Sequence, residues 1–392
     1  MKFLFIVQGE GRGHLTQAIS LARMLRRNGH EVVGALVGKS KSRKLPAFFE
    51  KDMECEVRTF TSPNFSKAGK DGRARLAATA LFNARRLPKY VRSIKFLKRC
   101  IEESGADRVV NFYEVLAGLT YWFYSPGVPQ YSVGHQYVFL HKDFELPRCE
   151  RLQIWMLRTL TRLTSIGAQE RLALSFRKMD DDTERHIAVV PPLLRDAVLE
   201  SKPTAGDYIH GYMLNPGFAR SLEKWHAEHP ETALRFFWDK QGEPACKRVD
   251  ATLTYYTLDD ELFVKQLAGC KAYACTAGFE SVCEAMYLGK PVMMVPAHIE
   301  QKCNAYDAAN NGAGIATDGF DVTRLLEFCR EYEPNDEFGE WVRSAESRFL
   351  GILEKSVYYA PTGLLSGYGK LPKRIAKWKN LAEEYLSLHR YF

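Results

Sequence analysis

Residues 274–304, ACTAGFESVCEAMYLGKPVMMVPAHIEQKCN, decide how this chain folds. The pattern predicts a short buried strand at 271–275, a turn of small residues, and a helix that begins directly after Gly278. A glycine turn between a strand and a helix leaves free backbone N–H groups at the positive end of the helix dipole. We therefore expect this turn to bind a phosphate group.

The residues that follow complete one structural unit. Glu284 lies one helical turn after Glu280, where a carboxylate behind a bound diphosphate can accept two hydrogen bonds from a ribose diol. Gly289-Lys290-Pro291 ends the helix, and 292–295 predicts a second buried strand. Glu300-Gln301 should lie on the loop beyond that strand, within reach of the same ligand.

The rest of the chain repeats this alternation of strands and helices. Strands are predicted at residues 2–8, 31–37, 108–112, 130–133 and 187–190, and again at 207–214, 234–238 and 252–256. The alternation predicts an α/β fold of two doubly wound Rossmann-like domains facing a cleft. Pro191-Pro192 is the best boundary, so we expect domains at 1–190 and 191–354, with a C-terminal tail and helix at 355–392.

Composition narrows the class of protein. The 392 residues are 46% hydrophobic and 26% charged, as in a soluble globular protein of two domains. No run of about 18 apolar residues occurs, and the N-terminus is a strand rather than a signal peptide. The nine cysteines form no CxxC pair, which favours a reducing cytoplasm and indicates no metal site.

The net charge of +8 is unevenly spread. Residues 1–190 carry 32 Lys and Arg against 19 Asp and Glu, whereas the remaining residues carry 23 against 28. The excess is greatest at 67–99, with eleven basic residues against Asp71 alone. This stretch either contacts an anionic lipid surface or a phosphorylated acceptor, or is the solvated face of a helix. No nucleic-acid motif accompanies the charge, so we expect no nucleic-acid partner.

A second glycine-rich loop, Gly9-Glu10-Gly11-Arg12-Gly13-His14, joins the first strand to its helix. A dinucleotide fingerprint would need glycine at position 14 and an acidic residue at the end of the second strand, and both are missing. His14 either caps its own helix or acts as a general base. The flanking glycines, which let a substrate approach closely, favour the base.

Two motifs carry a resemblance to a known family. GEGRGHLTQAISLARML at 9–25 resembles the N-terminal loop of inverting glycosyltransferases with the GT-B fold, and 275–305 resembles their C-terminal donor signature. These enzymes include the UDP-dependent glycosyltransferases and the lipid II-forming N-acetylglucosaminyltransferase. The order of strands and helices resembles that of the family along the whole chain, but the matching sequence motifs cover only about 50 residues.

The resemblance implies a function for each part of the chain. The N-terminal domain would bind the acceptor, the C-terminal domain the nucleotide-sugar, and the last helix would pack back on the N-terminal domain. His14 would be the catalytic base. The diphosphate, ribose, uracil and sugar would be held by Asn215, Gly217, Leu258, Thr276, Gly278, Phe279, Ser281, Glu284, Glu300 and Gln301. The acceptor side would include Gly11, Arg12, Gly13, Glu114 and His135.

This chain departs from the family at three positions. Arg12 stands where many members have glycine, Gln17 where they have proline, and Thr276 where they have histidine or arginine. The carboxylate pair E-x7-E of retaining relatives is also missing, because Thr276 occupies the position that is separated from Glu284 by seven residues. We therefore expect inversion, with the helix dipole rather than a metal ion stabilising the diphosphate and with no cofactor.

The sequence therefore predicts an enzyme that transfers a sugar, most simply from a UDP-linked donor, to an acceptor hydroxyl in glycan or cell-envelope synthesis. The expected acceptor is anionic or lipid-linked, and the expected location is cytoplasmic, at the inner face of the membrane. Two alternatives stay open: a UDP-sugar 2-epimerase, which shares the fold but opens on a different loop, and a non-catalytic subunit that binds nucleotide-sugars. Oligomeric state is not indicated.

Overall fold

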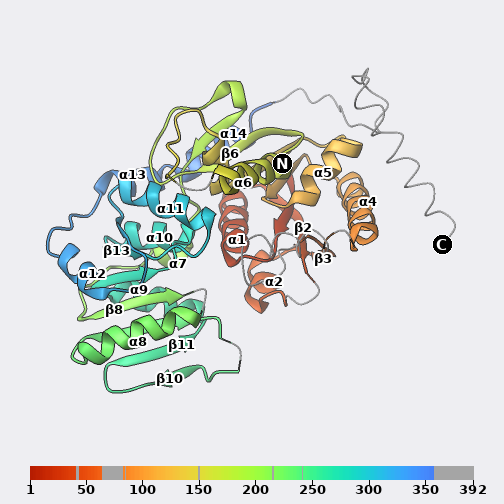
Figure 1. The fold of residues 1–392 in the computed structure, drawn as a ribbon. Helices are drawn as coiled ribbons and strands as arrows, with labels where there is room; N and C mark the ends of the chain where they lie inside the picture. The colour runs from red at the N-terminus through yellow and green to blue at the C-terminus, as the bar shows by residue number, and fades with distance from the viewer. Residues whose placement is uncertain are drawn as a thin grey trace. The chain divides into compact units, whose positions relative to one another are not determined.

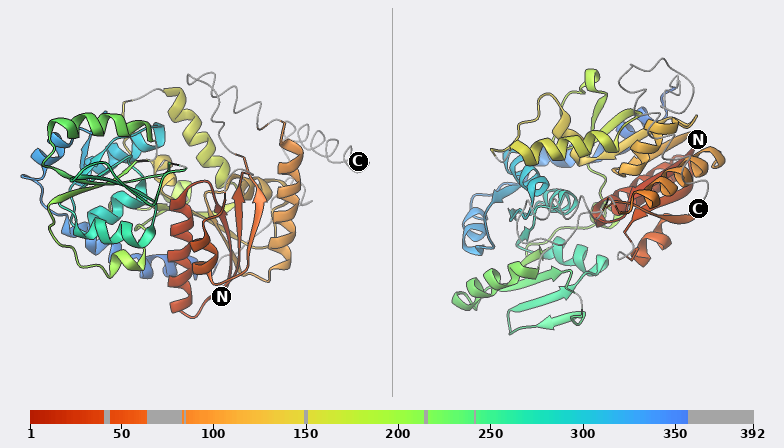
Figure 2. Two further views of the ribbon diagram at one scale, coloured as in Figure 1. Left: turned by 90° about the horizontal axis from the view of Figure 1, so that it is seen from below. Right: turned by 45° about the vertical axis from the view of Figure 1, so that its right-hand side comes forward.

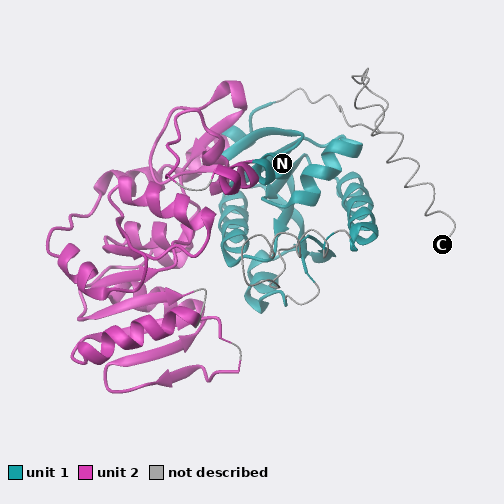
Figure 3. Cartoon of the chain, in the orientation of Figure 1, with its two compact units in different colours: residues 1–134, 159–172, 352–392 teal, residues 135–158, 173–351 magenta. Residues whose placement is uncertain are grey.

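The computed structural model describes residues 1–40, 44–63, 83, 85–148, 151–213, 216–240 and 242–356. The chain forms two compact units, coloured separately in Figure 3. Unit 1 comprises residues 1–134, 159–172 and 352–392, and unit 2 comprises 135–158 and 173–351. Asn215 and the predicted tail helix lie outside the described residues, as does most of the basic stretch before α4.

The first sheet has seven strands in the order β3-β2-β1-β4-β5-β6-β7. Its strands are β1 (Lys2–Gln8), β2 (Glu31–Lys39), β3 (Val57–Thr61), β4 (Arg108–Phe112), β5 (Gln130–Gly134), β6 (Ala168–Leu174) and β7 (Ile187–Val190). The central strands β1 and β4 are apolar and buried and pair in parallel, as expected of a sheet covered on both faces. Strand β3 was not predicted, because its edge position leaves Arg58 and Thr59 exposed and interrupts the apolar pattern.

Helices cover both faces of this sheet, as the left view of Figure 2 shows. Helix α4 (Leu87–Glu103) and helix α5 (Val115–Tyr124) pack on one face, where Leu97 and Tyr121 join the core of β1 and β4. Helix α1 (Arg12–Arg27) and helix α2 (Ala47–Met53) lie on the other face (Figure 1). Two further segments are the 3₁₀ turn η1 (His135–Leu140) and helix α6 (Arg151–Thr164).

The second sheet has the order β10-β11-β9-β8-β12-β13-β14 and is parallel except for its edge strand β10. Its strands are β8 (Tyr208–Met213), β9 (Ala233–Trp238), β10 (Cys246–Arg248), β11 (Leu253–Thr257), β12 (Ala272–Cys275), β13 (Val292–Met294) and β14 (Gly314–Ala316). One face carries α8 (Ala219–Glu228) and α12 (Val322–Phe328), whose apolar residues form one core with the sheet. The remaining helices are α7 (Asp196–Leu199), α9 (Asp260–Gly269), α10 (Phe279–Tyr287), α11 (Ile299–Asn310), α13 (Asp336–Arg343) and α14 (Ala345–Leu353).

The two parallel α/β sheets and their helices confirm the predicted fold class. Strand β12 and helix α10 begin within one residue of their predicted starts. The prediction that Glu300-Gln301 lie on a loop was wrong, because α11 begins at Ile299 rather than near Asn304. The early start is favoured electrostatically, since Glu300 places a negative charge in the first turn of the helix.

Within the described ranges, no helix combines the length and the apolar character needed to cross a membrane.

Candidate functional site

The predicted phosphate-binding turn lies at the point where the second sheet reverses its strand order. From β8 the chain continues to β9 on one side, and it later returns through β12 on the other side. In open α/β sheets, ligands bind outside the carboxyl ends of the strands at this reversal. The loop after β8 and the turn Thr276–Gly278 after β12 both leave the sheet there.

The turn before α10 has an unusual backbone. Ala277 has φ 54°, a left-handed conformation that is costly for a residue with a Cβ, and Gly278 is the N-cap of the helix. Asn304 donates from Nδ2 to the carbonyl oxygen of Ala277 at 3.1 Å, which holds the turn in this shape. Because Gly278 has no side chain, nothing of its own caps the first N–H groups of α10. A helix terminus without a side-chain cap can bind an anion, so the prediction for this turn stands.

The predicted diphosphate residues differ in their exposure. Thr276 and Phe279 are buried, whereas Gly278 and Ser281 are partly exposed. Ser281 Oγ donates to the carbonyl oxygen of Gly278 at 3.4 Å, within the first turn. The backbone amides of the turn, rather than a side-chain cation, are therefore the groups the structure offers to a diphosphate.

Glu284 lies one turn further along α10 and is held by a residue that the sequence did not indicate. Both carboxylate oxygens of Glu284 accept hydrogen bonds from Arg195. Nε donates to Oε1 and Nη2 donates to Oε2, each at 2.6 Å. The Glu284 side chain is 3% exposed, and that of Arg195 is 20% exposed. This is a bidentate, largely buried ion pair between residues 89 positions apart in the chain.

The Arg195 guanidinium is fixed from two further sides. Asp260 approaches it at 3.6 Å, and the guanidinium lies over the ring of Phe263 at 5.7 Å from the ring centre. Burial acts to lower the pKa of Arg195, but the charge and hydrogen bonds of Glu284, helped by Asp260, raise it overall. The arginine is therefore a permanent cation.

His135 packs against the first residue of α10. Its ring stacks on Phe279 with the ring centres 3.9 Å apart and the planes at 16°, and Nδ1 donates to the Leu174 carbonyl at 2.7 Å. Burial lowers the pKa of His135 to about 3, against the smaller effect of that hydrogen bond. His135, predicted on the acceptor side, belongs to unit 2 together with Phe279, where its neutral ring supports the start of α10.

Glu300 and Gln301 are oriented by short hydrogen bonds in the first turn of α11. Gln136 Nε2 donates to Glu300 Oε1 at 2.8 Å. Gln301 Oε1 accepts from the backbone N–H of Ala297 at 2.8 Å, a capping interaction that turns the side chain back toward the start of the helix. Both side chains are fixed rather than free, as sugar-binding residues need to be.

The structure describes two of the remaining predicted donor residues. Gly217 lies in the 3₁₀ turn η3 (Pro216–Phe218) after β8, at the strand reversal. Leu258 follows β11 and directly precedes Asp259, the N-cap of α9, whose carboxylate accepts from Leu262 N at 2.8 Å. Leu258 is half-buried, and its contact with a base stays a prediction.

In unit 1 the corresponding reversal lies between β1 and β4, and His14 is at this point. His14 is in the first turn of α1, its ring stacked on that of Tyr113 with centres 5.5 Å apart and planes at 19°. Its Nδ1 lies 3.2 Å from Gln17 Oε1. Tyr113 directly follows β4, has φ 59°, and its hydroxyl is 2.8 Å from Thr161 Oγ1. The strained tyrosine is a residue that the sequence analysis missed.

The glycine-rich loop before α1 is shaped by close contacts. A Cβ on Gly9 would lie 2.6 Å from Val37 Cγ1 and 3.0 Å from the Gly38 carbonyl oxygen, so only glycine fits. Gly11 is the N-cap of α1, and its N–H donates to Gln8 Oε1 at 3.3 Å. Arg12 and Gly13 follow in the first turn, with the Arg12 guanidinium 5.4 Å from the centre of the Phe48 ring.

Glu114, predicted on the acceptor side, is the buried N-cap of α5. Its Oε1 accepts from Leu116 N at 3.0 Å and from Ser62 Oγ at 2.6 Å. Its Oε2 is buried without a hydrogen-bond partner, packed against Gly38. Burial raises the pKa of Glu114 to about 7, against the lowering effect of these hydrogen bonds.

Among the described residues, no group of His, Cys, Asp and Glu side chains gathers in a way that could hold a metal ion. The run Asp180-Asp181-Asp182 is used structurally, since Asp181 pairs with Arg348 at 2.6 Å and Asp182 pairs with Arg185 at 2.9 Å. The absence of a metal or cofactor stays a prediction.

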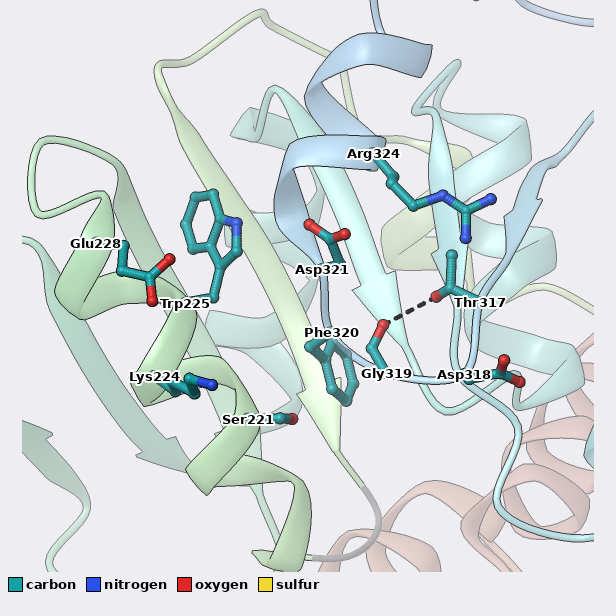
Figure 4. Close-up of a pocket in the computed structure, with 10 residues that line it drawn as sticks. All are labelled: Ser221, Lys224, Trp225, Glu228, Thr317, Asp318, Gly319, Phe320, Asp321 and Arg324. Carbon is teal, nitrogen blue, oxygen red and sulfur yellow. Dashed lines mark hydrogen bonds between the residues drawn. The ribbon is translucent and has the colours of Figure 1, made fainter.

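A pocket of about 440 Å³ lies elsewhere in unit 2, between α8 and the loop after β14 (Figure 4). It is lined by Ser221, Lys224, Trp225, Glu228, Thr317, Asp318, Gly319, Phe320, Asp321 and Arg324. None of the predicted site residues is among them, and the charges at its rim are of both signs. We therefore place the candidate site at α10 and not at this pocket.

A family model described as glycosyl transferase family 1 matches residues 1–332. A search of curated proteins gives no match.

Solved structures show where the fold has been seen. The glycotransferase of kitacinnamycin is 17% identical over 90% of this chain and 98% of its own, with a TM-score of 0.59. UGT2 of Phytolacca americana, complexed with UDP-2fluoro-glucose and pterostilbene, is 12% identical over 97% of this chain and 98% of its own, with a TM-score of 0.55. The UDP-GlcNAc 2-epimerase of Neisseria meningitidis, bound to UDP-GlcNAc, is 12% identical over 91% of this chain and 100% of its own, also with a TM-score of 0.55. At these identities the likeness shows the GT-B fold alone, and transferases and an epimerase share it.

Proposed function

The chain belongs to glycosyl transferase family 1, and from this premise we propose that it transfers a sugar from a nucleotide-linked donor, most simply a UDP-sugar, to an acceptor hydroxyl with inversion. One observation carries the proposal. The start of α10, whose N-cap Gly278 makes no side-chain cap hydrogen bond, lies at the strand reversal of the second sheet, with the fixed carboxylate of Glu284 one turn behind it.

The donor would be held in parts by unit 2. The N–H groups that follow Thr276 and the dipole of α10 would stabilise the diphosphate, both when bound and when it leaves. Glu284 would accept a hydrogen bond from a ribose hydroxyl. Glu300 and Gln301, oriented by their own hydrogen bonds, would contact hydroxyls of the sugar.

The base would be His14 of unit 1. If Gln17 Oε1 accepts from Nδ1–H, the lone pair of His14 is on Nε2 and can take the proton from an acceptor hydroxyl. The hydroxyl oxygen would form a bond to the anomeric carbon as the bond to the diphosphate breaks, in one displacement. Thr276 in place of a second carboxylate supports this single inverting step over a retaining one.

An anionic or lipid-linked acceptor is the next part of the proposal. Most of the described part of the basic stretch is α4, on which Arg92, Lys95 and Arg99 are exposed beside a buried apolar face. Such a face suits phosphate groups or an anionic membrane surface. Sedimentation with liposomes should show a preference for anionic over neutral lipid, and equal sedimentation with both would remove this part of the proposal.

A thermal-shift screen with UDP, GDP, TDP and their sugar conjugates tests the donor site, because a ligand that binds only the native state raises the melting temperature. We expect one nucleotide family to stabilise the wild type and to lose this effect in Glu284→Ala. Stabilisation by none of them would refute the proposal. Incubation with UDP-GlcNAc and no acceptor separates the functions, since an epimerase would turn the sugar over and a transferase would leave its configuration unchanged.

A further inference from the structure

Arg195 is not explained by the family resemblance, yet it makes the shortest polar contacts to a predicted donor residue. It precedes α7, of which it is the N-cap, and its side chain reaches α10 rather than its own helix. The two hydrogen bonds to Glu284, each 2.6 Å, are parallel bonds from one planar group. The rotation of the Glu284 carboxylate is therefore set by Arg195.

A guanidinium fork fixes a carboxylate in a way that an ammonium group cannot. Lysine is a point charge, whereas the five donors of arginine have a rigid geometry that aligns both carboxylate oxygens in one plane. A carboxylate has about four lone-pair sites, so two stay available after a bidentate pair has formed. In Glu284 these two sites lie in the plane that Arg195 defines, one on each outer edge of the carboxylate and pointing apart, so a ribose can use one of them through one hydroxyl.

Charge gives Arg195 a second effect on an anionic ligand. Glu284 and Asp260 are both close to Arg195, and without this cation two carboxylates would be near the place where a diphosphate binds. Buried ion pairs often add little to stability compared with apolar residues, because desolvation cancels most of their attraction. The position of this pair behind the anion-binding terminus of α10 therefore favours a role in recognition.

We propose that Arg195 is a positioning residue that orients Glu284 to select the ribose over the deoxyribose form of the donor nucleotide. This inference rests on the proposed function and deepens it, because it assigns the recognition of the sugar of the nucleotide to a pair of residues rather than to Glu284 alone.

Calorimetric titration with UDP and 2′-deoxy-UDP, and with GDP and 2′-deoxy-GDP, measures this selection. The wild type should bind the ribose form of its nucleotide roughly 10- to 100-fold more tightly, the range expected for losing a hydrogen bond to a charged group. Arg195→Lys keeps the charge and removes the fork, and should reduce this ratio to about threefold or less. A purely structural role would weaken both forms equally and leave the ratio unchanged.

Two further variants sharpen the result. Asp260→Asn removes a charge next to Arg195 and keeps both hydrogen bonds to Glu284, so its ratio should stay well above that of Arg195→Lys. In Glu284→Gln the ratio should already be low, and adding Arg195→Lys should not lower it further, because the arginine acts through this carboxylate.

The outcomes separate this inference from the proposed function. Tight binding of UDP or GDP with an unchanged ratio in Arg195→Lys overturns the inference and leaves the donor site standing. No binding of either diphosphate to the wild type overturns both. If Arg195→Lys does not fold, Glu284→Asp draws the carboxylate out of the fork with both charges kept, and should lose the selection in the same way; full selection in that variant overturns the inference.

Discussion

The substitution Glu114→Gln tests quantitatively whether the Glu114 side chain is buried in unit 1 as the structure shows. The side chain is fully buried, and its Oε1 accepts from Leu116 N and Ser62 Oγ. A glutamine keeps an oxygen for both bonds and loses only the ability to ionise. The variant therefore isolates the free energy of placing a negative charge at this site.

The expected magnitude follows from the pKa of Glu114, which burial raises from 4.5 to about 7. Between these two values the folded protein keeps a proton that the unfolded chain has released, so the wild type loses stability as the pH rises through this window. Glu114→Gln has no such loss. The unfolding free energy of the variant relative to wild type should rise by on the order of 3 kcal/mol between pH 4.5 and 7, and then level off.

Urea denaturation of both proteins at intervals from pH 4.5 to 8.5 measures this difference. The urea midpoint of the transition that reports on unit 1 should change with pH differently in the two proteins. Subtracting the two unfolding free energies at each pH removes the contributions of every other titrating group. A difference that is constant across the range would refute the reasoning, because it would mean that Glu114 is ionised in the folded protein throughout.

Three other substitutions test separate parts of the structure. His14→Ala should lower turnover by about 10²- to 10⁴-fold and leave UDP affinity unchanged; equal turnover in stopped assays would exclude His14 as the base. Gly38→Ala would put a Cβ 2.1 Å from Glu114 Oε2 and should lower stability by about 1–3 kcal/mol in urea titrations, whereas Gly127→Ala, which has open space, should change little. Burial lowers the pKa of His210 to about 3, so the wild type loses stability as the pH falls below 6.5; His210→Phe should gain relative to it by about 1.4 kcal/mol per pH unit between 6.5 and 3, and a flat difference in acid denaturation would contradict this.

The fold was predictable where burial produces a continuous apolar run. Strand β4 matches its predicted range because Val109, Val110 and Phe112 are apolar and buried, with Asn111 as the one polar residue among them. The short edge strand β14 was missed, because three residues that are partly or fully exposed give no period to detect. The start of α11 was misjudged because its N-cap, His298, is not one of the residues that usually mark a helix start.

The candidate site was predictable in its local motifs and not in its long-range pairs. The turn before α10 and the first turn of α1 are contiguous in sequence, and the structure places each at the strand reversal of its sheet. The pairing of Arg195 with Glu284 depends on how α7 and α10 pack, which no local pattern encodes. The stacking of Tyr113 on His14 is likewise a product of the tertiary fold, and a positive φ cannot be read from a tyrosine.

The central claim is that the backbone at the start of α10 binds a nucleoside diphosphate. Hydrogen–deuterium exchange of residues 276–284 with and without saturating UDP or GDP tests it most directly, because bound phosphate oxygens would protect the N–H groups of this turn. We predict that one of the two nucleotides slows exchange in this segment, with a smaller effect in Glu284→Ala at the same concentration. Unchanged exchange at 276–284 with a nucleotide that calorimetry shows to be bound would contradict the account.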